Sequence, residues 1–351
     1  MAEWPTGTMR ALSIEGPRDV RVVTRPIPAP QPGHALVRVS HVGLCGTDAE
    51  LYTGASPFFA QGTAAYPLTP GHEWSGTVVA TTPGVTHVRV GDRVVGDPFV
   101  TCGHCEMCRV DRRNLCVRRR EMGVRTAVPG APALSGAAAE LVAVPDSVLT
   151  CVPAQVGLDV AALVEPAVTA IEGVRRCAVG ARDRVAVIGT GTLGLLAAMA
   201  AVATGARVEA VGVDDAGLAL ARELGCVAAH RPRDAPADSC SVVVEASGAE
   251  PAFGDALRIA APGGRVALLG IPPGDVRVPG AAAVLKDLTI HGVLGGVHNW
   301  AHAVGLVTDG SLRAAELIDD RIPFAEGHEG FRRLVEGPRR RPKLLLAVGD
   351  A

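Results

Sequence analysis

Four cysteines fall close together in the sequence, at Cys102, Cys105, Cys108 and Cys116. Spacings of three, three and eight residues let short loops turn four thiolates toward one point, and Gly103 eases the first turn. Zinc bound by four sulfurs has no open position for a substrate, so the pattern predicts a structural zinc site in a lobe spanning 97–120. A disulfide pair and an iron–sulfur cluster use similar spacings and are the alternatives.

A second set of potential metal ligands is dispersed along the chain. Cys45 stands in Cys-Gly-Thr-Asp, His72 and Glu73 follow Gly71, and Glu165 precedes a proline. One thiolate, one imidazole and one or two carboxylates form the kind of set that leaves a zinc position open for water or substrate. Each residue alone also has a structural explanation, as a buried thiol, a turn histidine or a helix cap, and spacing alone does not bring them together.

A glycine-rich turn indicates nucleotide binding. Gly189, Gly191 and Gly194 match G-x-G-x-x-G, with Leu193 inside the motif, directly after the strand-like run 184–188 and at the start of an Ala/Leu-rich helix. In that context the glycines permit a tight turn, a close approach of the backbone to a pyrophosphate, and close packing of helix on strand. The pattern predicts dinucleotide binding; the alternative is a tight strand-to-helix turn that binds no ligand.

The residue that would bind the adenosine ribose is less regular. An acid is expected about 20 residues after the glycines. Gly212 stands near that place, with Asp214 and Asp215 just after it, and the next arginine is Arg222. Two carboxylates without a nearby cation favour NAD over NADP. Asp214 has a second interpretation as the N-cap of the following helix.

These residues lie in two regions whose sequence patterns predict different secondary structure. Up to about residue 150 the chain alternates short strand-like runs with Gly and Pro, which indicates an all-β region. From about 155 onward, apolar strands at 184–188, 207–213, 241–246 and 265–270 alternate with helices, including one expected over 158–179. That alternation predicts an α/β fold with a doubly wound parallel sheet, the Rossmann arrangement, over 156–295.

Composition excludes several classes of function. The 351 residues carry a formal net charge of −2 and only 3% aromatics, so we expect no nucleic-acid partner. The first residues lack a basic and apolar leader, and the apolar runs are too short to cross a membrane, so we expect no membrane association. Nine cysteines, four of them clustered, fit a reducing compartment and indicate the cytoplasm.

Taken together, the motifs resemble the zinc-dependent medium-chain alcohol/polyol dehydrogenases, including sorbitol and threonine dehydrogenases. The resemblance extends from Met9 to about Val348. It rests on these ordered segments: Gly43-Leu-Cys45-Gly-Thr-Asp48, Pro70-Gly-His72-Glu73-Trp-Ser-Gly76, Gly91-Asp-Arg-Val-Val95, the four-cysteine lobe, Glu165-Pro166, the 189–194 turn, and Glu245-Ala-Ser-Gly248.

The resemblance implies roles for individual residues. Cys45, His72 and Glu165 would bind the catalytic zinc, and Glu73 would be a ligand or exchange with water and substrate. Thr47 would accept the proton of the alcohol. Glu50 stands where members of the family often carry a histidine that ends the proton relay, and a carboxylate could serve there.

The resemblance also implies the overall organisation. A GroES-like catalytic domain would comprise 1–155 and 296–351, around the Rossmann domain at 156–295, with the active site in the cleft between them. Two zinc ions per chain, a bound NAD and a homodimer or homotetramer are expected.

The leading functional hypothesis is hydride transfer between NAD(P) and a secondary alcohol, interconverting alcohol and ketone. The substrate would be a polyol, a cyclitol or an amino-polyol. The motifs also resemble bacterial cyclitol dehydrogenases of aminocyclitol antibiotic pathways, which suggests specialised metabolism. Within enzymes, the alternative is a threonine-type amino-alcohol or primary alcohol dehydrogenase. The alternative that is not an enzyme is a dinucleotide-binding sensor that has kept the fold. Such a protein would be expected to lack one of the zinc ligands Cys45, His72 and Glu165, or Thr47, but all four residues are present.

Overall fold

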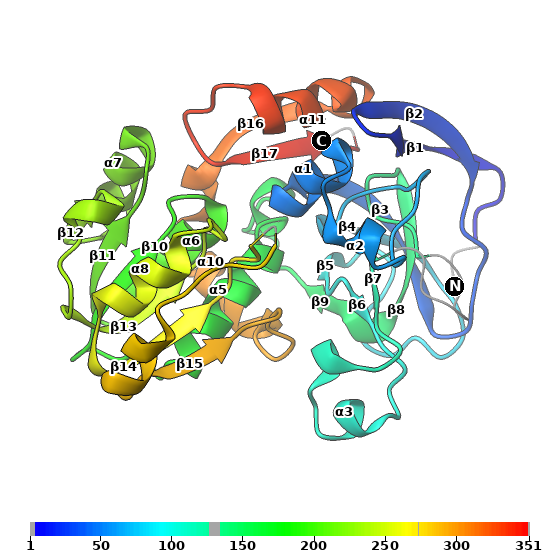
Figure 1. The fold of residues 1–351 in the computed structure, drawn as a ribbon. Coiled ribbons are helices and arrows are strands. Elements are labelled where there is room, and N and C mark those ends of the chain that lie inside the picture. Colours follow the sequence, from blue (N-terminus) through cyan, green and yellow to red (C-terminus); the bar gives the residue numbers. More distant parts are fainter. Residues whose placement is uncertain (1–3, 126–133, 273, 350–351) are drawn as a thin grey trace. The chain divides into compact units, whose positions relative to one another are not determined.

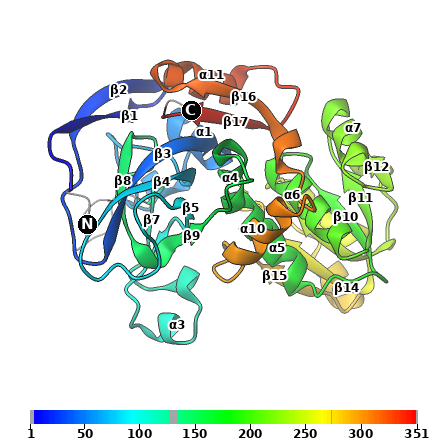
Figure 2. The same cartoon turned by 180° about the vertical axis from the view of Figure 1, so that it is seen from behind.

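The computed structural model describes residues 4–125, 134–272 and 274–349 (Figure 1; Figure 2). The chain divides into two compact units. The first contains the chain up to Glu165, the segment Ile318–Arg339 and the segment from Lys343 onward, and the second contains Pro166–Leu317 with Arg340–Pro342. Residues 156–165, expected in the Rossmann domain, thus lie in the first unit, and 296–317, expected in the catalytic domain, lie in the second. The ends of the expected segments 1–155 and 296–351 lie outside the described residues.

The first unit is built on a seven-stranded sheet with the order β16-β17-β3-β4-β5-β9, in which β8 also pairs with β3. These strands are β3 (His34–Leu44), β4 (Glu73–Thr81), β5 (Arg93–Gly96), β8 (Leu141–Pro145), β9 (Leu149–Cys151), β16 (Ile318–Pro323) and β17 (Lys343–Ala347). Two strand pairs accompany the sheet: β1 (Thr8–Gly16) with β2 (Asp19–Pro26), and β6 (Phe99–Val100) with β7 (Arg120–Glu121).

Short helices complete the first unit. They are α1 (Gly46–Thr53), α2 (Pro57–Ala60), α3 (Glu106–Arg109), α4 (Leu158–Ala161) and α11 (Gly327–Glu336). Trp74, Phe331 and Leu44 belong to one buried core formed by the sheet, the β1–β2 hairpin and α11. Gly330 lets α11 approach this core, because a Cβ there would lie 3.2–3.3 Å from Ile322, Leu346 and Leu44. The sequence analysis did not predict α11.

The second unit is a doubly wound parallel sheet, as predicted. Its order is β12-β11-β10-β13-β14-β15, and every pairing is parallel. The strands are β10 (Arg184–Ile188), β11 (Arg207–Val211), β12 (Ala228–His230), β13 (Cys240–Glu245), β14 (Ala260–Leu268) and β15 (Thr289–Gly292). In chain order this is 3-2-1-4-5-6, the Rossmann arrangement.

Helices lie on both faces of this sheet (Figure 1; Figure 2). They are α5 (Val164–Arg176), α6 (Thr192–Ala203), α7 (Asp215–Glu223), α8 (Ala252–Ile259), α9 (Gly280–Leu285) and α10 (Trp300–Thr308). The helix expected over 158–179 is two helices, α4 and α5, so that Glu165 lies in the first turn of α5. None of the helices in the described ranges combines the length and hydropathy that a bilayer crossing requires.

Candidate catalytic and cofactor sites

The first unit brings the dispersed candidate ligands together. Cys45 follows β3 and is the N-cap of α1, while His72 immediately precedes β4; Gly43 and Glu73 are register partners in these neighbouring strands. The Cys45 Sγ lies 3.2 Å from the His72 Nε2. Ligand atoms of His72, Glu73 and Glu165 lie within 4.8 Å of one another, as do those of Cys45, Asp48 and His72. The pairing of β3 with β4 therefore brings Cys45 close to His72 and Glu73, and the first turn of α5 adds Glu165, so that two groups of potential ligands share His72.

The electrostatics of this cluster fit a bound cation. Burial raises the pKa of the Cys45 thiol. Burial also raises the pKa of Glu165 to about 8, and the neighbouring Glu73 carboxylate acts in the same direction. Without a cation these groups are driven toward their neutral forms, because a buried negative charge is costly. Zinc would reverse this, since it binds the thiolate and the carboxylate.

Two buried polar atoms at the cluster lack hydrogen-bond partners among the described residues: the His72 Nδ1 and the Asp48 Oδ1, which lie 4.0 Å apart. Burial tends to lower the pKa of His72, but the nearby Cys45 and Asp48 outweigh it and raise that pKa well above its usual value. A metal on the opposite ring nitrogen would fix His72 as a neutral ligand with its Nδ1 proton directed toward Asp48, an arrangement common for metal-bound histidines. The residues therefore fit a zinc ion.

Glu73 has a partner that the sequence analysis missed. The Lys343 Nζ donates to the Glu73 Oε2 at 2.6 Å and to the Leu44 carbonyl at 3.0 Å. The two charged side chains are 1% and 3% exposed. Lys343 is 270 residues from Glu73 in the sequence, so only the pairing of β17 with β3 and of β3 with β4 brings them together.

The two candidate proton-relay residues both lie in α1. Thr47 is half-buried and two residues beyond Cys45, and Glu50 follows three residues later. Residues three apart on a helix lie on the same face. Burial raises the pKa of Glu50. Asp48, which the sequence analysis quoted only as part of a motif, is fully buried, and its Oδ2 accepts from the Cys45 backbone N–H at 3.0 Å. The signal for it was its place at the third position of α1, where a carboxylate caps the helix start.

The four clustered cysteines also converge. All four sulfurs lie within 4.8 Å of one another, and the Cys105–Cys108 and Cys102–Cys116 pairs are each 3.5 Å apart. A disulfide would bring two sulfurs to about 2 Å, and all nine cysteines are free. Four thiolates about 2.3 Å from a tetrahedral zinc would be about 3.8 Å apart, which the observed spacing approaches. The geometry fits the predicted zinc and not disulfides.

The glycine turn occupies the expected place in the second unit. It joins β10 to α6, at the point where the sheet order reverses between β11 and β13, and such points bind ligands in open α/β sheets. A Cβ on Gly194 would lie 1.9 Å from the Gly189 carbonyl oxygen, whereas a Cβ on Gly191 would meet nothing within 4 Å. Leu193 lies in the first turn of α6. Gly194 is thus needed for packing, and Gly191 borders open space at a helix N-terminus, as a pyrophosphate requires.

Asp214 is the N-cap of α7, which confirms the alternative considered for it. Its Oδ1 accepts from the Gly217 N–H at 2.6 Å, and its Oδ2 accepts from the Thr190 hydroxyl at 3.0 Å. A side chain at Gly212 would collide with Thr190, whose Cγ2 lies 2.6 Å from the Cβ position. An acid at the end of β11 would therefore require Thr190 to move, and the carboxylate that is bonded to the glycine turn is that of Asp214.

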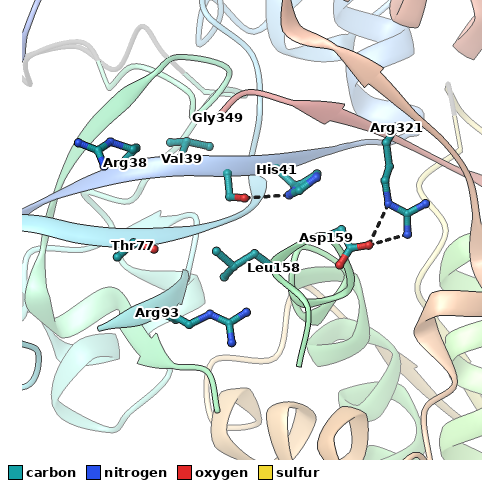
Figure 3. Close-up of a pocket in the computed structure, with 10 residues that line it drawn as sticks. Arg38, Val39, His41, Thr77, Arg93, Leu158, Asp159, Arg321 and Gly349 are labelled. Carbon is teal, nitrogen blue, oxygen red and sulfur yellow. Dashed lines mark hydrogen bonds and ion pairs between the residues drawn. The ribbon is translucent and has the colours of Figure 1, made fainter. Parts of the chain in front are cut away.

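A separate surface pocket of about 570 Å³ lies in the first unit (Figure 3). It is lined by Arg38, Val39, Ser40, His41, Thr77, Arg93, Leu158, Asp159, Arg321 and Gly349, none of them a predicted site residue. Arg321 is paired with Asp159 at 2.9 Å, and Arg93 donates to three backbone carbonyls. Because these cations already have partners, we assign the pocket no role in the chemistry.

Known proteins resemble this chain over nearly its whole length. Residues 31–155 match the alcohol dehydrogenase GroES-like domain, and residues 192–309 match the zinc-binding dehydrogenase domain. An L-threonine 3-dehydrogenase of Deinococcus deserti is 34% identical, over 94% of this chain and 96% of that protein. A protein of Aspergillus clavatus named Probable D-xylulose reductase A is 30% identical, over 92% and 93%.

Solved structures share the fold. A zinc-binding dehydrogenase of Sinorhizobium meliloti, bound to NADP, superposes with a TM-score of 0.87 at 28% identity, covering 97% of this chain and 99% of that one. An alcohol dehydrogenase of Escherichia coli CFT073, complexed with NADH, gives the same TM-score and coverage at 25% identity. With the ligand clusters and the glycine turn described above, these matches place the chain among the zinc-dependent medium-chain alcohol/polyol dehydrogenases, a family of enzymes.

Proposed function

We propose that the protein transfers a hydride between NAD(P) and a secondary alcohol, with a catalytic zinc held by Cys45, His72 and Glu165. The observation that supports this proposal is the position of His72, which lies 3.2 Å from the Cys45 Sγ and forms a second group of potential ligands with Glu73 and Glu165. A zinc in such a set acts as a Lewis acid that favours loss of the alcohol proton. Three protein ligands leave one position for the substrate oxygen.

The proton would leave through α1. The Thr47 hydroxyl accepts it from the alcohol, and Glu50, on the same helix face, passes it to solvent. The raised pKa of Glu50 supports this assignment, because an acid–base group works best when its pKa approaches the working pH. A bound NAD(P) would supply the acceptor for the carbon-bound hydrogen of the alcohol, which leaves as a hydride. The four-cysteine lobe would hold the second zinc ion, which only stabilises the fold.

The cofactor preference that we propose is NAD. Asp214 and Asp215 are both exposed at the start of α7. The side chain of Arg231 lies 2.5 Å from Asp215 and is therefore already neutralised by it. The same ion pair offsets the charge of Asp215, so the repulsion of a 2′-phosphate would come from Asp214, to which a ribose hydroxyl could instead donate.

For the substrate we propose a polyol, a cyclitol or an amino-polyol, with a role in specialised metabolism. A ligand set with Glu165 in place of a second cysteine supports polyols, by resemblance to the family. The second candidate is an amino alcohol of the threonine type, because the L-threonine 3-dehydrogenase of Deinococcus deserti is 34% identical.

We further propose a cytoplasmic homodimer or homotetramer. Leu285 and Val284 in α9 are 85% and 79% exposed, and Ile290 lies in β15, which ends the sheet of the second unit. An apolar surface beside an unpaired strand edge is the kind of surface that a second copy covers. The nine free cysteines support a reducing compartment.

The test is a substrate screen with parallel metal analysis. NAD+ and NADP+ reduction is followed by the absorbance of the reduced nicotinamide, against polyols, cyclitols, aminocyclitols and amino alcohols. We expect turnover with one class and two zinc ions per chain, of which Cys45→Ser removes or weakens one and abolishes turnover. Normal turnover by Cys45→Ser, or a single zinc in the wild type, would refute the catalytic-zinc proposal.

A further inference from the structure

The side chain of Thr190, inside the glycine turn, is directed toward the start of α7. Thr190 lies between Gly189 and Gly191, where the backbone would approach the pyrophosphate. Its side chain is buried, and its hydroxyl donates to the Asp214 Oδ2 at 3.0 Å. One buried side chain therefore connects the turn that would bind the pyrophosphate to the carboxylate that would receive the ribose.

Two glycines leave the space that the Thr190 side chain occupies. A Cβ on Gly212 would lie 2.6 Å from the Thr190 Cγ2, and a Cβ on Gly217 would lie 2.5 Å from the Thr190 Oγ1. Gly212 directly follows the last residue of β11. Dinucleotide-binding folds carry the acid that binds the ribose in this part of the chain. Thr190 therefore fills, from the glycine turn, the space into which a side chain at the strand end would project.

The Asp214 carboxylate is held through both of its oxygens. The Gly217 N–H donates to Oδ1 at 2.6 Å, and the Thr190 hydroxyl donates to Oδ2. The bond to Gly217 fixes one oxygen, and the bond to Thr190 fixes the direction of the other. Asp214 is exposed, and each carboxylate oxygen accepts more than one hydrogen bond, so this capping leaves room for a ribose hydroxyl.

We propose that Thr190 is a positioning residue for cofactor specificity. It takes the space of an acid at the end of β11 and holds Asp214 against the glycine turn, so that Asp214 receives the adenosine ribose in place of that acid. This inference rests on the proposed function, because it presupposes a dinucleotide at the turn with its ribose beside Asp214. The preference for NAD thus depends on an uncharged hydroxyl as well as on the carboxylate.

The test measures the NAD preference, defined as the Kd for NADP+ divided by the Kd for NAD+, by calorimetric titration of the full-length protein. Thr190→Val keeps the side-chain shape and removes the donor, so the preference should fall about tenfold or less, as far as in Asp214→Ser. Thr190→Ser keeps the hydroxyl and should keep the preference. The matched control is Thr204→Val, which removes a hydroxyl bonded to the Ala201 carbonyl at the other end of α6 and should not change the preference.

Two double variants separate positioning from a general loss of stability. Thr190→Val/Asp214→Ser should lose no more preference than either single variant, because both changes remove the same contact. Thr190→Ala/Gly212→Asp opens the space at the strand end and places an acid there, with the Leu218 side chain as the remaining neighbour at 3.3 Å. It should regain the preference that Thr190→Ala loses.

A third probe is NAD+ whose adenosine ribose lacks the 2′-hydroxyl. The wild type should bind this analogue more weakly than NAD+, because the hydroxyl can no longer donate to the carboxylate, whereas Thr190→Val should bind the two alike. A loss of stability alone would weaken the binding of both and leave their ratio as in the wild type, which would overturn the inference.

The remaining outcomes distinguish this inference from the proposed function. If Thr190→Val keeps the wild-type preference while Asp214→Ser loses it, the inference is wrong and the proposed function stands. Losses that add in Thr190→Val/Asp214→Ser, or no recovery in Thr190→Ala/Gly212→Asp, would overturn it equally. If Thr190→Val does not fold, Thr190→Ala decides by the same comparison. A wild type without a preference for NAD, or Asp214→Ser with the wild-type preference, would refute the proposed cofactor preference and this inference with it.

Discussion

Two glycines of the same turn should respond in opposite ways to the same substitution. Gly194→Ala places a Cβ 1.9 Å from the Gly189 carbonyl oxygen, where an ordinary contact is 3.4–4 Å. α6 and β10 would have to separate by roughly 1.5 Å, and overpacking of this kind costs about 1–3 kcal/mol. Gly191→Ala meets nothing within 4 Å and costs at most about 1 kcal/mol, because alanine is a poorer N-cap for α6 than glycine.

Dinucleotide affinity should not follow stability in this pair. If the pyrophosphate approaches the backbone at Gly191, the added methyl group removes one or two charge-assisted hydrogen bonds, worth about 1.5–3 kcal/mol, and weakens NAD binding about 10- to 100-fold. Gly194→Ala should lower the melting temperature by about 2–4 °C per kcal/mol lost and weaken NAD binding as well.

Thermal unfolding without cofactor and calorimetric titration with NAD measure the two effects separately. The matched control is Gly180→Ala, because Gly180 lies outside the glycine turn and a Cβ there also meets nothing within 4 Å. The reasoning fails if Gly191→Ala binds NAD as tightly as the control, or if it is destabilised as much as Gly194→Ala.

Three other predictions concern metal, pH and cofactor choice. Cys105→Ser should lower the melting temperature and release one zinc, whereas Cys45→Ser should leave the melting temperature nearly unchanged and abolish turnover; equal loss of stability in both would argue against one closed and one open site. Burial alone would raise the pKa of Glu172, but hydrogen bonds from Arg175, Arg176 and Asn299 lower it to about 2. A carboxyl whose pKa falls from its usual 4.5 to about 2 in the folded protein stabilises the fold by about 3 kcal/mol above pH 4.5, and this contribution is lost as the pH falls toward 2. The stability difference between the wild type and Glu172→Gln should therefore be full at pH 7 and shrink between about pH 4 and 2. A pH-independent difference in urea denaturation would contradict this. Asp214→Ser keeps an N-cap and removes the charge, so the ratio of NADP to NAD affinity should rise about tenfold or less, as expected for one exposed charge near a phosphate; an unchanged ratio would separate Asp214 from the ribose site.

The sequence predicts local motifs well and long-range contacts poorly. The four cysteines and the glycine turn each lie within fifteen residues or fewer, so their spacing constrains their geometry directly. The parallel sheet follows from the alternation of apolar strands and helices. The helix expected over 158–179 is interrupted near Ala162 and Leu163, because helical periodicity alone does not show where two helices with similar apolar faces divide.

The candidate catalytic cluster, in contrast, depends on contacts between distant segments. Cys45, His72 and Glu165 could be proposed as one set only by resemblance, since nothing in their spacing brings them together. The structure adds the physical cause for Cys45 and His72, which is the register of β3 against β4, and it adds two further residues, Asp48 and Lys343. Asp48 is one helix-capping carboxylate among many candidates, and Lys343 looks like any strand residue until β17 is paired with β3.

This pairing also explains why the chain returns to the first unit after the Rossmann sheet. β17 lies between β16 and β3 in the seven-stranded sheet, and its first residue supplies the buried ammonium group beside Glu73. The four-cysteine lobe needs no such long-range support, because its four sulfur atoms come from one stretch of fifteen residues.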